Sequence, residues 1–172
     1  RICSWSSDGR LLFAESNLKV EPNNIRDIWA LDVASKKASS VFSDPTANLT
    51  SPVLSPDGRW LAYASDESGI NQLYVRPYPA LDRKWQISQN GLLIQTTFFA
   101  LAETTYRPHW RNDGRELLFI SMNGSIDAVS VEPNDKNFIA TYPKTLFKPS
   151  FPLIALSASP DHSRFLAAIV PG

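Results

Sequence analysis

Several residue types that carry chemistry are scarce in this sequence of 172 residues. It has one cysteine, Cys3, so no disulfide can form within the chain. Its two histidines, His109 and His162, show no His-x-x-x-His pattern, and we expect no metal site and no cofactor. Basic and acidic residues both number 17, and this zero net charge argues against a nucleic-acid partner.

Signatures of known catalytic machinery are absent as well. The chain has no Gly-x-Ser-x-Gly nucleophile elbow, no Gly-x-x-x-x-Gly-Lys phosphate loop, and neither the His-Arg-Asp nor the Asp-Phe-Gly signature of protein kinases. Its most apolar run, residues 92–101, is interrupted by Gln95, Thr96 and Thr97 and is shorter than the roughly 20 residues that cross a bilayer. We therefore expect a protein that is not an enzyme and is not inserted directly in a membrane.

One short pattern is present four times and organises the chain. Its clearest copy, Leu-Ser-Pro-Asp-Gly-Arg-Trp-Leu-Ala-Tyr at residues 54–63, reads as a strand end, a tight turn and a second strand. Related copies begin at Ser6, Arg111 and Ser159. The aspartates of the four copies are 49, 56 and 48 residues apart: Asp8, Asp57, Asp113 and Asp161.

A period of about 40–50 residues with one hairpin per unit is typical of a β-propeller. Short runs of alternating apolar and polar residues supply about four strands per unit. We therefore predict an all-β fold, a partial β-propeller of about three and a half four-stranded antiparallel blades. The predicted single domain is 1–172, with approximate blades at 1–48, 49–91, 105–149 and 150–172 and an insertion at 92–104.

The turn residues have chemical reasons to recur. Proline fixes φ near the value of the first corner, and the aspartate carboxylate accepts hydrogen bonds from turn amides. Glycine supplies the positive φ that closes the hairpin. A catalytic acid has no reason to recur in every unit, so these residues are predicted to be structural: Asp8, Gly9, Asp57, Gly58, Asp113, Gly114 and Asp161. His162 replaces the glycine in the fourth unit, and because histidine tolerates positive φ less well we expect that hairpin to be the least regular.

The insertion before the third unit is apolar, with Leu92, Leu93 and residues 98–102. Two interpretations are open. The favoured one is a buried short helix or extra strand that caps the ring, and the other is a contact surface for a partner.

One predicted inner strand carries the candidate binding residues. Arg107 and His109 are two residues apart, so they share a face, with Pro108 and Trp110 opposite. If Trp110 packs between blades, Arg107 and His109 line the central channel and Tyr106 lies at its mouth. Two interpretations are open. One is that these three residues contact a peptide or a small anionic ligand. The other, which is the favoured one, is that Arg107 pairs with a neighbouring acid.

Acidic residues on the predicted loops are the remaining candidates for acid–base chemistry. No two of them are spaced convincingly for a general acid and a general base, so solvated loop acids are the preferred interpretation. They are Glu21, Asp44, Asp66, Glu67 and Glu103.

Residues 51–89 and 107–119 carry a family resemblance. The Ser-Pro-Asp-Gly turn, the Arg-Trp-Leu-Ala-Tyr strand and the later Gln-Leu-Tyr-Val-Arg strand resemble the TolB-like propeller repeat. They are most similar to the carboxy-terminal propeller of bacterial eukaryotic-like serine/threonine kinases and related envelope proteins. The resemblance implies a ring of about six blades and a periplasmic or cell-envelope location. The same repeat also serves the gating propellers of prolyl-oligopeptidase-type peptidases.

These observations favour a non-enzymatic propeller module that binds a protein, a peptide or a small ligand. An incomplete ring leaves apolar blade faces at both ends, which predicts either a larger parent protein or pairing with a second copy. We thus expect the sensor or interaction part of a larger or self-associating bacterial protein. The alternative is the propeller portion of a peptidase or other hydrolase whose catalytic residues lie outside this chain.

Overall fold

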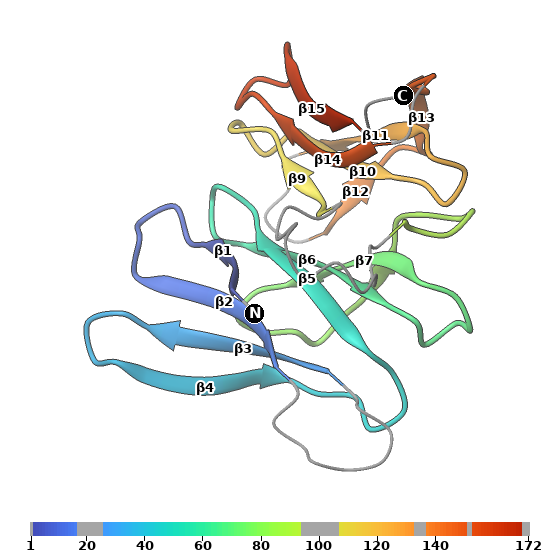
Figure 1. Ribbon diagram of the computed structural model, residues 1–172. Coiled ribbons are helices and arrows are strands. Elements are labelled where there is room, and N and C mark those ends of the chain that lie inside the picture. The colour runs from blue at the N-terminus through green and yellow to red at the C-terminus, as the bar shows by residue number, and fades with distance from the viewer. Residues whose placement is uncertain (1, 17–25, 94–106, 133–136, 151–152, 170–172) are drawn as a thin grey trace.

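The strands of the protein form four antiparallel sheets that follow one another along an arc (Figure 1). The computed structural model describes residues 2–16, 26–93, 107–132, 137–150 and 153–169. Within these ranges the chain consists of β-strands, turns and irregular segments, without a helix. The predicted all-β, partial-propeller fold is confirmed. In the described part of the chain, no helix suited to crossing a membrane is present.

The first sheet has four strands in sequence order. The strands are β1 (Ile2–Trp5), β2 (Leu11–Ser16), β3 (Asp27–Asp32) and β4 (Lys37–Phe42). Phe13 and Ile28 are fully buried and contribute to a core cluster that they share with Leu61 and Tyr63 of the second sheet. The first two sheets therefore pack on each other through apolar faces.

The second sheet repeats this order with β5 (Leu49–Leu54), β6 (Trp60–Ser65), β7 (Gln72–Pro77) and β8 (Trp85–Gln86). All residues of β6 are buried, so the sheet is covered on both faces. The outer strand β8 is short, because its regular pairing with β7 ends at Gln86. Beyond that point the hydroxyl of Ser88 accepts a hydrogen bond from Leu73 N at 2.8 Å, in place of a backbone carbonyl.

The third sheet has a divided outer edge. Its strands are β9 (His109–Trp110), β10 (Glu116–Ile120), β11 (Ile126–Glu132), β12 (Ile139–Ala140) and β13 (Lys144–Phe147). Both β12 and β13 pair with β11, and β12 was not expected from the sequence. Pro143 lies between these two short strands, and proline cannot donate a hydrogen bond to the ladder.

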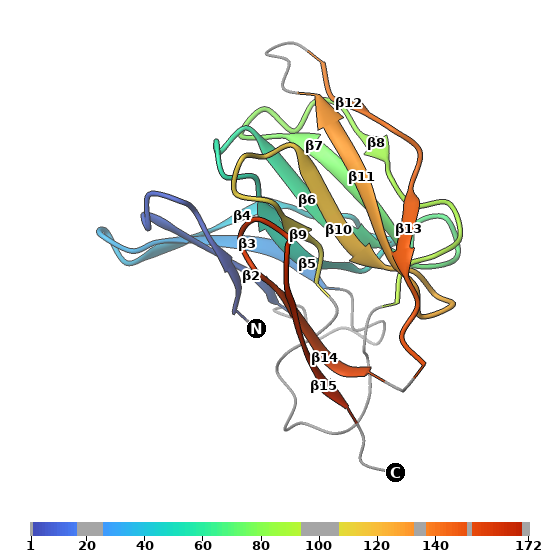
Figure 2. The same ribbon diagram turned by 90° about the horizontal axis from the view of Figure 1, so that it is seen from above.

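The second and third sheets face each other across the largest core cluster (Figure 2). Trp110 is only 6% exposed and belongs to this cluster, as does Trp60 of the second sheet. The rings of Trp60 and Phe138 meet edge to face, with their centroids 5.1 Å apart. Trp110 thus packs between blades, which was the condition for Arg107 and His109 to face the channel.

The fourth sheet is a hairpin of β14 (Leu153–Ala158) and β15 (Phe165–Ile169). Leu156 and Phe165 pack against the buried Ile120 and Ile126 of the third sheet. The ring of Phe165 also meets that of Phe147, with centroids 5.2 Å apart. The hairpin is therefore attached to the third sheet by an apolar contact of its own.

A hydrogen-bonded turn centred on aspartate closes the inner hairpin of the second sheet. The carboxylate oxygen Oδ1 of Asp57 accepts from the hydroxyl of Ser55 at 2.6 Å and from Arg59 N at 3.1 Å. The hydroxyl oxygen of Ser55 in turn accepts from Trp60 N at 2.9 Å. One carboxylate and one hydroxyl thus satisfy the polar groups of the turn.

The other three units contain the same turn. Ser6 donates to Asp8 and Ser159 donates to Asp161, both at 2.6 Å, the same distance as in the second unit. In the third unit Arg111 occupies the position of the serine, and its guanidinium donates to both oxygens of Asp113 at 2.9 and 3.0 Å.

The fourth hairpin is not the least regular, and that expectation was wrong. His162 adopts a φ of 58°, close to the 69°, 73° and 70° of Gly9, Gly58 and Gly114. His162 N donates to Ser159 O at 2.8 Å, as the three glycines do at the corresponding carbonyls. A positive φ costs a non-glycine residue of the order of 1 kcal/mol. Contacts of the His162 side chain, described below, offset this cost.

Replacing Asp57 with alanine should lower the free energy of unfolding by about 1–3 kcal/mol, because the buried Ser55 hydroxyl and the Arg59 amide lose their acceptor. Urea unfolding measures the change. The matched control is Asp82→Ala, which removes an exposed acid whose ion pair with Arg83 spans 3.8 Å, and which should change stability by less than about 0.5 kcal/mol. Equal effects of the two substitutions would contradict the structural role of Asp57.

Candidate functional site

A cavity of about 330 Å³ opens where the inner strands of the four sheets converge. Its wall includes one residue from each unit at the same position of the repeat, four residues before the turn aspartate. These residues are Ser4, Val53, His109 and Ser157. Because equivalent positions of a propeller repeat surround its central axis, the cavity corresponds to a sector of the central channel.

The rest of the cavity wall is mostly apolar. Pro108, Leu118, Ile120, Ile126 and Leu156 contribute aliphatic groups. The charged group on the wall is the guanidinium of Arg107, which donates a hydrogen bond to the carbonyl of Cys3. This bond connects the third unit to the first unit. The cavity therefore combines an apolar lining with a cation and an imidazole.

Two of the three predicted binding residues, Arg107 and His109, lie on the cavity wall. Pro108, expected on the opposite face, is on the wall too, because the regular strand begins only at His109 and strict alternation does not hold before it. Trp110 points into the core as expected. Tyr106 lies outside the described residues.

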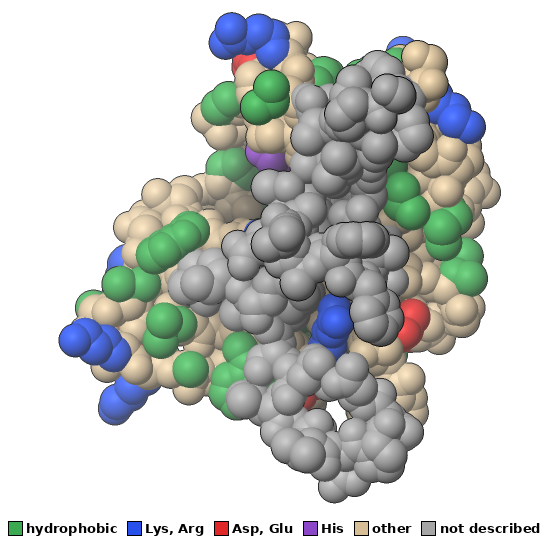
Figure 3. Space-filling view, viewed as in Figure 1, with side chains coloured by type: hydrophobic (Ala, Val, Ile, Leu, Met, Phe, Trp, Pro, Cys, Tyr) green, Lys and Arg blue, Asp and Glu red, His purple; other side chains and the backbone are tan. Residues whose placement is uncertain are grey.

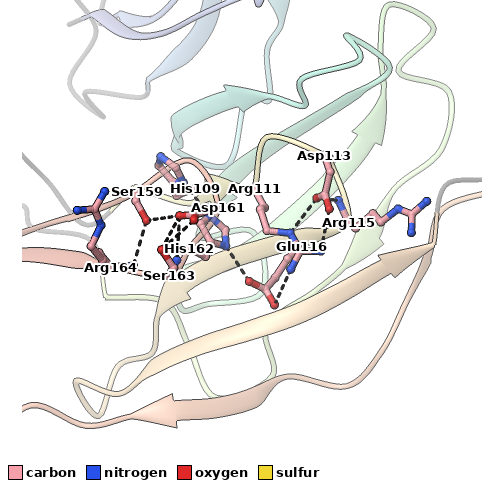
Figure 4. Close-up of polar contacts among 10 residues, drawn as sticks. All are labelled: His109, Arg111, Asp113, Arg115, Glu116, Ser159, Asp161, His162, Ser163 and Arg164. Atoms are coloured by element: carbon pink, nitrogen blue, oxygen red, sulfur yellow. Dashed lines mark hydrogen bonds and ion pairs between the residues drawn. The ribbon is translucent and has the colours of Figure 1, made fainter.

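His109 is held by a second histidine that comes from the fourth hairpin (Figure 4). Nδ1 of His109 lies 3.0 Å from Nε2 of His162, and Nδ1 of His162 lies 2.7 Å from Oε1 of Glu116. The side chain of His162 is only 3% exposed. The three residues thus form a continuous hydrogen-bonded chain that begins on β10, crosses the fourth turn and ends at the cavity wall.

One arginine beside this chain is shared between two carboxylates. Nη1 of Arg111 lies 3.8 Å from Oε2 of Glu116, but the guanidinium is also bound to Asp113 through two hydrogen bonds. Burial, and then the neighbouring His162, lower the pKa of His109 below its ordinary value of 6.5. His109 is therefore neutral near pH 7.

The loop acids considered as candidates for acid–base chemistry are not brought together. Asp44 accepts from the amide and hydroxyl of Thr46, and Asp66 accepts from the backbone and side-chain amides of Asn48. Glu67 forms an ion pair with Lys84. Glu21 and Glu103, like most of the insertion at 92–104, lie outside the described residues. Among the described residues, no group of three or more potential metal ligands is found.

The sequence analysis missed two features of the site. It considered His162 as a metal ligand and as a turn residue but not as a hydrogen-bond partner of His109, although a histidine at a position that favours glycine is itself a signal that the side chain has a partner. It also missed Ser4, Val53 and Ser157 as cavity residues. Their common offset from the turn aspartate could have identified them.

The four sheets and the axial cavity define a β-propeller, here an incomplete one. Comparison with solved structures specifies a TolB-like β-propeller fold. The chain aligns over 99% of its length with TolB from Acinetobacter baumannii (TM-score 0.68, 18% identity, 38% of that chain). It aligns equally fully with a protein described as TolB from Agrobacterium tumefaciens (TM-score 0.66, 15% identity, 58% of that chain).

A prolyl endopeptidase structure is similar over 99% of this chain and 26% of its own, with a TM-score of 0.56 and 13% identity. No protein-family model and no curated protein sequence matches the chain. At these identities the likeness establishes the fold, and the chain spans 58% and 38% of the two TolB structures. The closer resemblance to kinase-linked propellers stays a prediction.

The lowered pKa of His109 predicts a pH dependence of stability. Since the unfolded chain binds the proton at higher pH than the folded chain, the free energy of unfolding should fall as pH decreases below about 6.5. Urea titrations at pH 7 and pH 5 should show a smaller loss for His109→Gln than for the wild type. An equal loss in both proteins would show that His109 is not responsible.

Proposed function

We propose that this chain is a non-enzymatic propeller module that binds a peptide or a small anionic ligand in the axial cavity. The observation that carries the proposal is the position of Arg107 and His109 on the wall of a cavity formed by all four inner strands. Ligands of propellers commonly enter where equivalent strands converge, because the channel is concave and its polar groups point inward.

The chemistry of the wall suggests the ligand class. A volume of about 330 Å³ is near the lower end of typical ligand pockets, which suits a peptide terminus or a small molecule. The aliphatic groups of Leu118, Ile120 and Leu156 favour an apolar body. Arg107 favours a carboxylate, since guanidinium and carboxylate groups form strong charge-assisted hydrogen bonds.

The proposed biological setting is that of an interaction or sensor module in the bacterial cell envelope. TolB-like folds among the structural neighbours support this setting by analogy of fold. The loop acids among the described residues, Asp44, Asp66 and Glu67, are each engaged in local hydrogen bonds or ion pairs, which supports a binding role over acid–base catalysis. A screen of peptide and glycan substrates should show no turnover, and reproducible hydrolysis would contradict the proposal.

Arg107→Ala should weaken the binding of short apolar peptides with a free terminal carboxylate by about tenfold or more, since a hydrogen bond to a charged group contributes roughly 1.5–3 kcal/mol. Titration calorimetry measures the affinity. Arg83→Ala is the matched control, because this exposed arginine lies outside the cavity wall. Thermal melts of both variants test whether loss of the contact with Cys3 also affects folding. Unchanged affinity in a folded Arg107→Ala protein would argue against the cavity as the binding site.

We further propose that the open ends of the arc bind a partner, either a second copy or the remainder of a larger protein. Strand register places Trp5, Leu31 and Ala38 in one row across the first sheet, on the face opposite Phe13. Trp5 is 56% exposed, and Leu166 on the fourth hairpin is 77% exposed. Hydrophobic side chains are visible on the surface over the first sheet and the fourth hairpin (Figure 3). Exposed apolar groups at both ends support an association surface.

Light scattering of the isolated chain at micromolar concentration should show self-association, because these end faces bury apolar surface when they pair. Trp5→Ser should reduce the association, whereas Lys37→Ser, a change on the exposed strand β4, should not. A monomer with a cooperative melt and no binding of a hydrophobic dye would contradict the proposed association surface.

A further inference from the structure

The hydrogen-bonded chain Glu116–His162–His109 ends at the cavity, and its chemistry determines what the cavity presents to a ligand. Glu116 as a carboxylate can only accept hydrogen bonds, so the bond of 2.7 Å requires a proton on Nδ1 of His162. In a neutral His162 the other nitrogen, Nε2, is then an acceptor. The bond of 3.0 Å to His109 therefore requires a proton on Nδ1 of His109.

This arrangement leaves Nε2 of His109 without a proton. His109 lines the cavity, and among the described residues its Nε2 has no hydrogen-bond partner. The neutral chain thus presents a hydrogen-bond acceptor to the ligand, and such an acceptor repels a carboxylate. A carboxylate that contacts Nε2 of His109 as well as Arg107 therefore requires a proton on that nitrogen.

One added proton produces that change. A proton that binds Nε2 of His109 allows the proton on Nδ1 of His109 to pass to Nε2 of His162. An N–H bond forms at Nε2 of His109, the N–H bond at Nδ1 of His109 breaks, and one forms at Nε2 of His162. The positive charge then resides on His162, beside the Glu116 carboxylate, and His109 is a neutral ring that donates into the cavity.

We propose that the axial cavity binds carboxylate ligands together with one proton, which is relayed through His109 to His162. The inference rests on the proposed function of the cavity and adds the ligand class and its regulation by pH. The depressed pKa of His109 in the free protein agrees with it, because a ligand can couple to proton uptake only where the proton is not already bound.

The surrounding charges are consistent with a single transferable proton. Arg111, the nearest cation to Glu116 among the described residues, is largely neutralised by Asp113. Asp161, on the same turn as His162, is occupied by Ser159 and Ser163. On the cavity side the neighbouring groups that can carry charge are Arg107 and the buried thiol of Cys3.

The turn position of His162 allows a substitution that removes the imidazole and keeps the backbone conformation. Its turn position holds glycine in the other three units, and a Cβ at two of them, Gly9 and Gly58, would meet nothing within 4 Å. His162→Gly therefore keeps the turn geometry and removes the relay. Glu116→Gln keeps an oxygen acceptor and the side-chain size but removes the negative charge that stabilises a protonated His162.

The first arm of the test needs no ligand. The chain has only two histidines, so long-range proton–nitrogen NMR spectra can report the protonation of all four ring nitrogens. At pH 8 both rings should be neutral with the proton on Nδ1, and acidification should shift the signals of both rings together. In His162→Gly, His109 should titrate as a single ring. A proton on Nε2 of His109 at pH 8 in the wild-type protein would overturn the relay.

The second arm measures binding of 3-phenylpropionate, with the uncharged 3-phenylpropanamide as the control, by calorimetry between pH 5 and 8. In buffers of different ionisation enthalpy, the carboxylate should bind with uptake of close to one proton. Its affinity should fall up to tenfold per pH unit at the alkaline end. The amide should show neither effect. His162→Gly should flatten the pH dependence, and Glu116→Gln should move it to lower pH.

The two arms separate the possible failures. Carboxylate binding without proton uptake, and with the same pH profile in His162→Gly, would overturn the relay while leaving the cavity as a binding site. Failure of both probes to bind wild-type protein at any pH would contradict the proposed function and this inference together.

Discussion

The fold of this protein depends on one hydrogen-bonded turn in which an aspartate carboxylate replaces missing backbone partners. In each unit the carboxylate accepts a backbone amide two residues later, at 2.9–3.1 Å. A hairpin turned this tightly leaves amides without a backbone acceptor, and the carboxylate supplies that acceptor from within the turn itself. The turn fixes where each inner strand ends, and four equal turns place four inner strands at equal positions around one axis.

The binding cavity follows from that repetition. Ser4, Val53, His109 and Ser157 lie at one repeat position and surround one space, although they comprise three different types of side chain. The repeat provides the shape of the cavity, and single substitutions within it provide the function. The fourth unit shows this most clearly, because a histidine at the glycine position adopts the same turn and carries its imidazole to the third unit. Asn112 N, which donates to Pro160 O at 2.8 Å, supports the same contact.

The sequence predicted the strands well where the signal was local. The turns at Asp57 and Asp113 and the alternation at residues 72–76 each specify a hairpin or strand without reference to the rest of the chain. The ends of outer strands were harder, because Ser88 and Pro143 act through side-chain and backbone chemistry that alternation does not show. The pair of His109 and His162 was out of reach of pattern analysis, since the two residues are 53 positions apart and meet only through the docking of β14 and β15 on the third sheet.

Hydrogen exchange at individual turn amides tests the central claim most directly. The amides of Ser55, Arg111 and Ser159 each donate to the carbonyl five residues later, at 2.7–2.9 Å. If all units form the same turn and the fourth hairpin is docked on the third sheet, the amides of Ser159 and Asn112 should be protected along with those of Ser55 and Arg111. Exchange of Ser159 and Asn112 at the rate of an open chain, while Ser55 and Arg111 stay protected, would contradict the account.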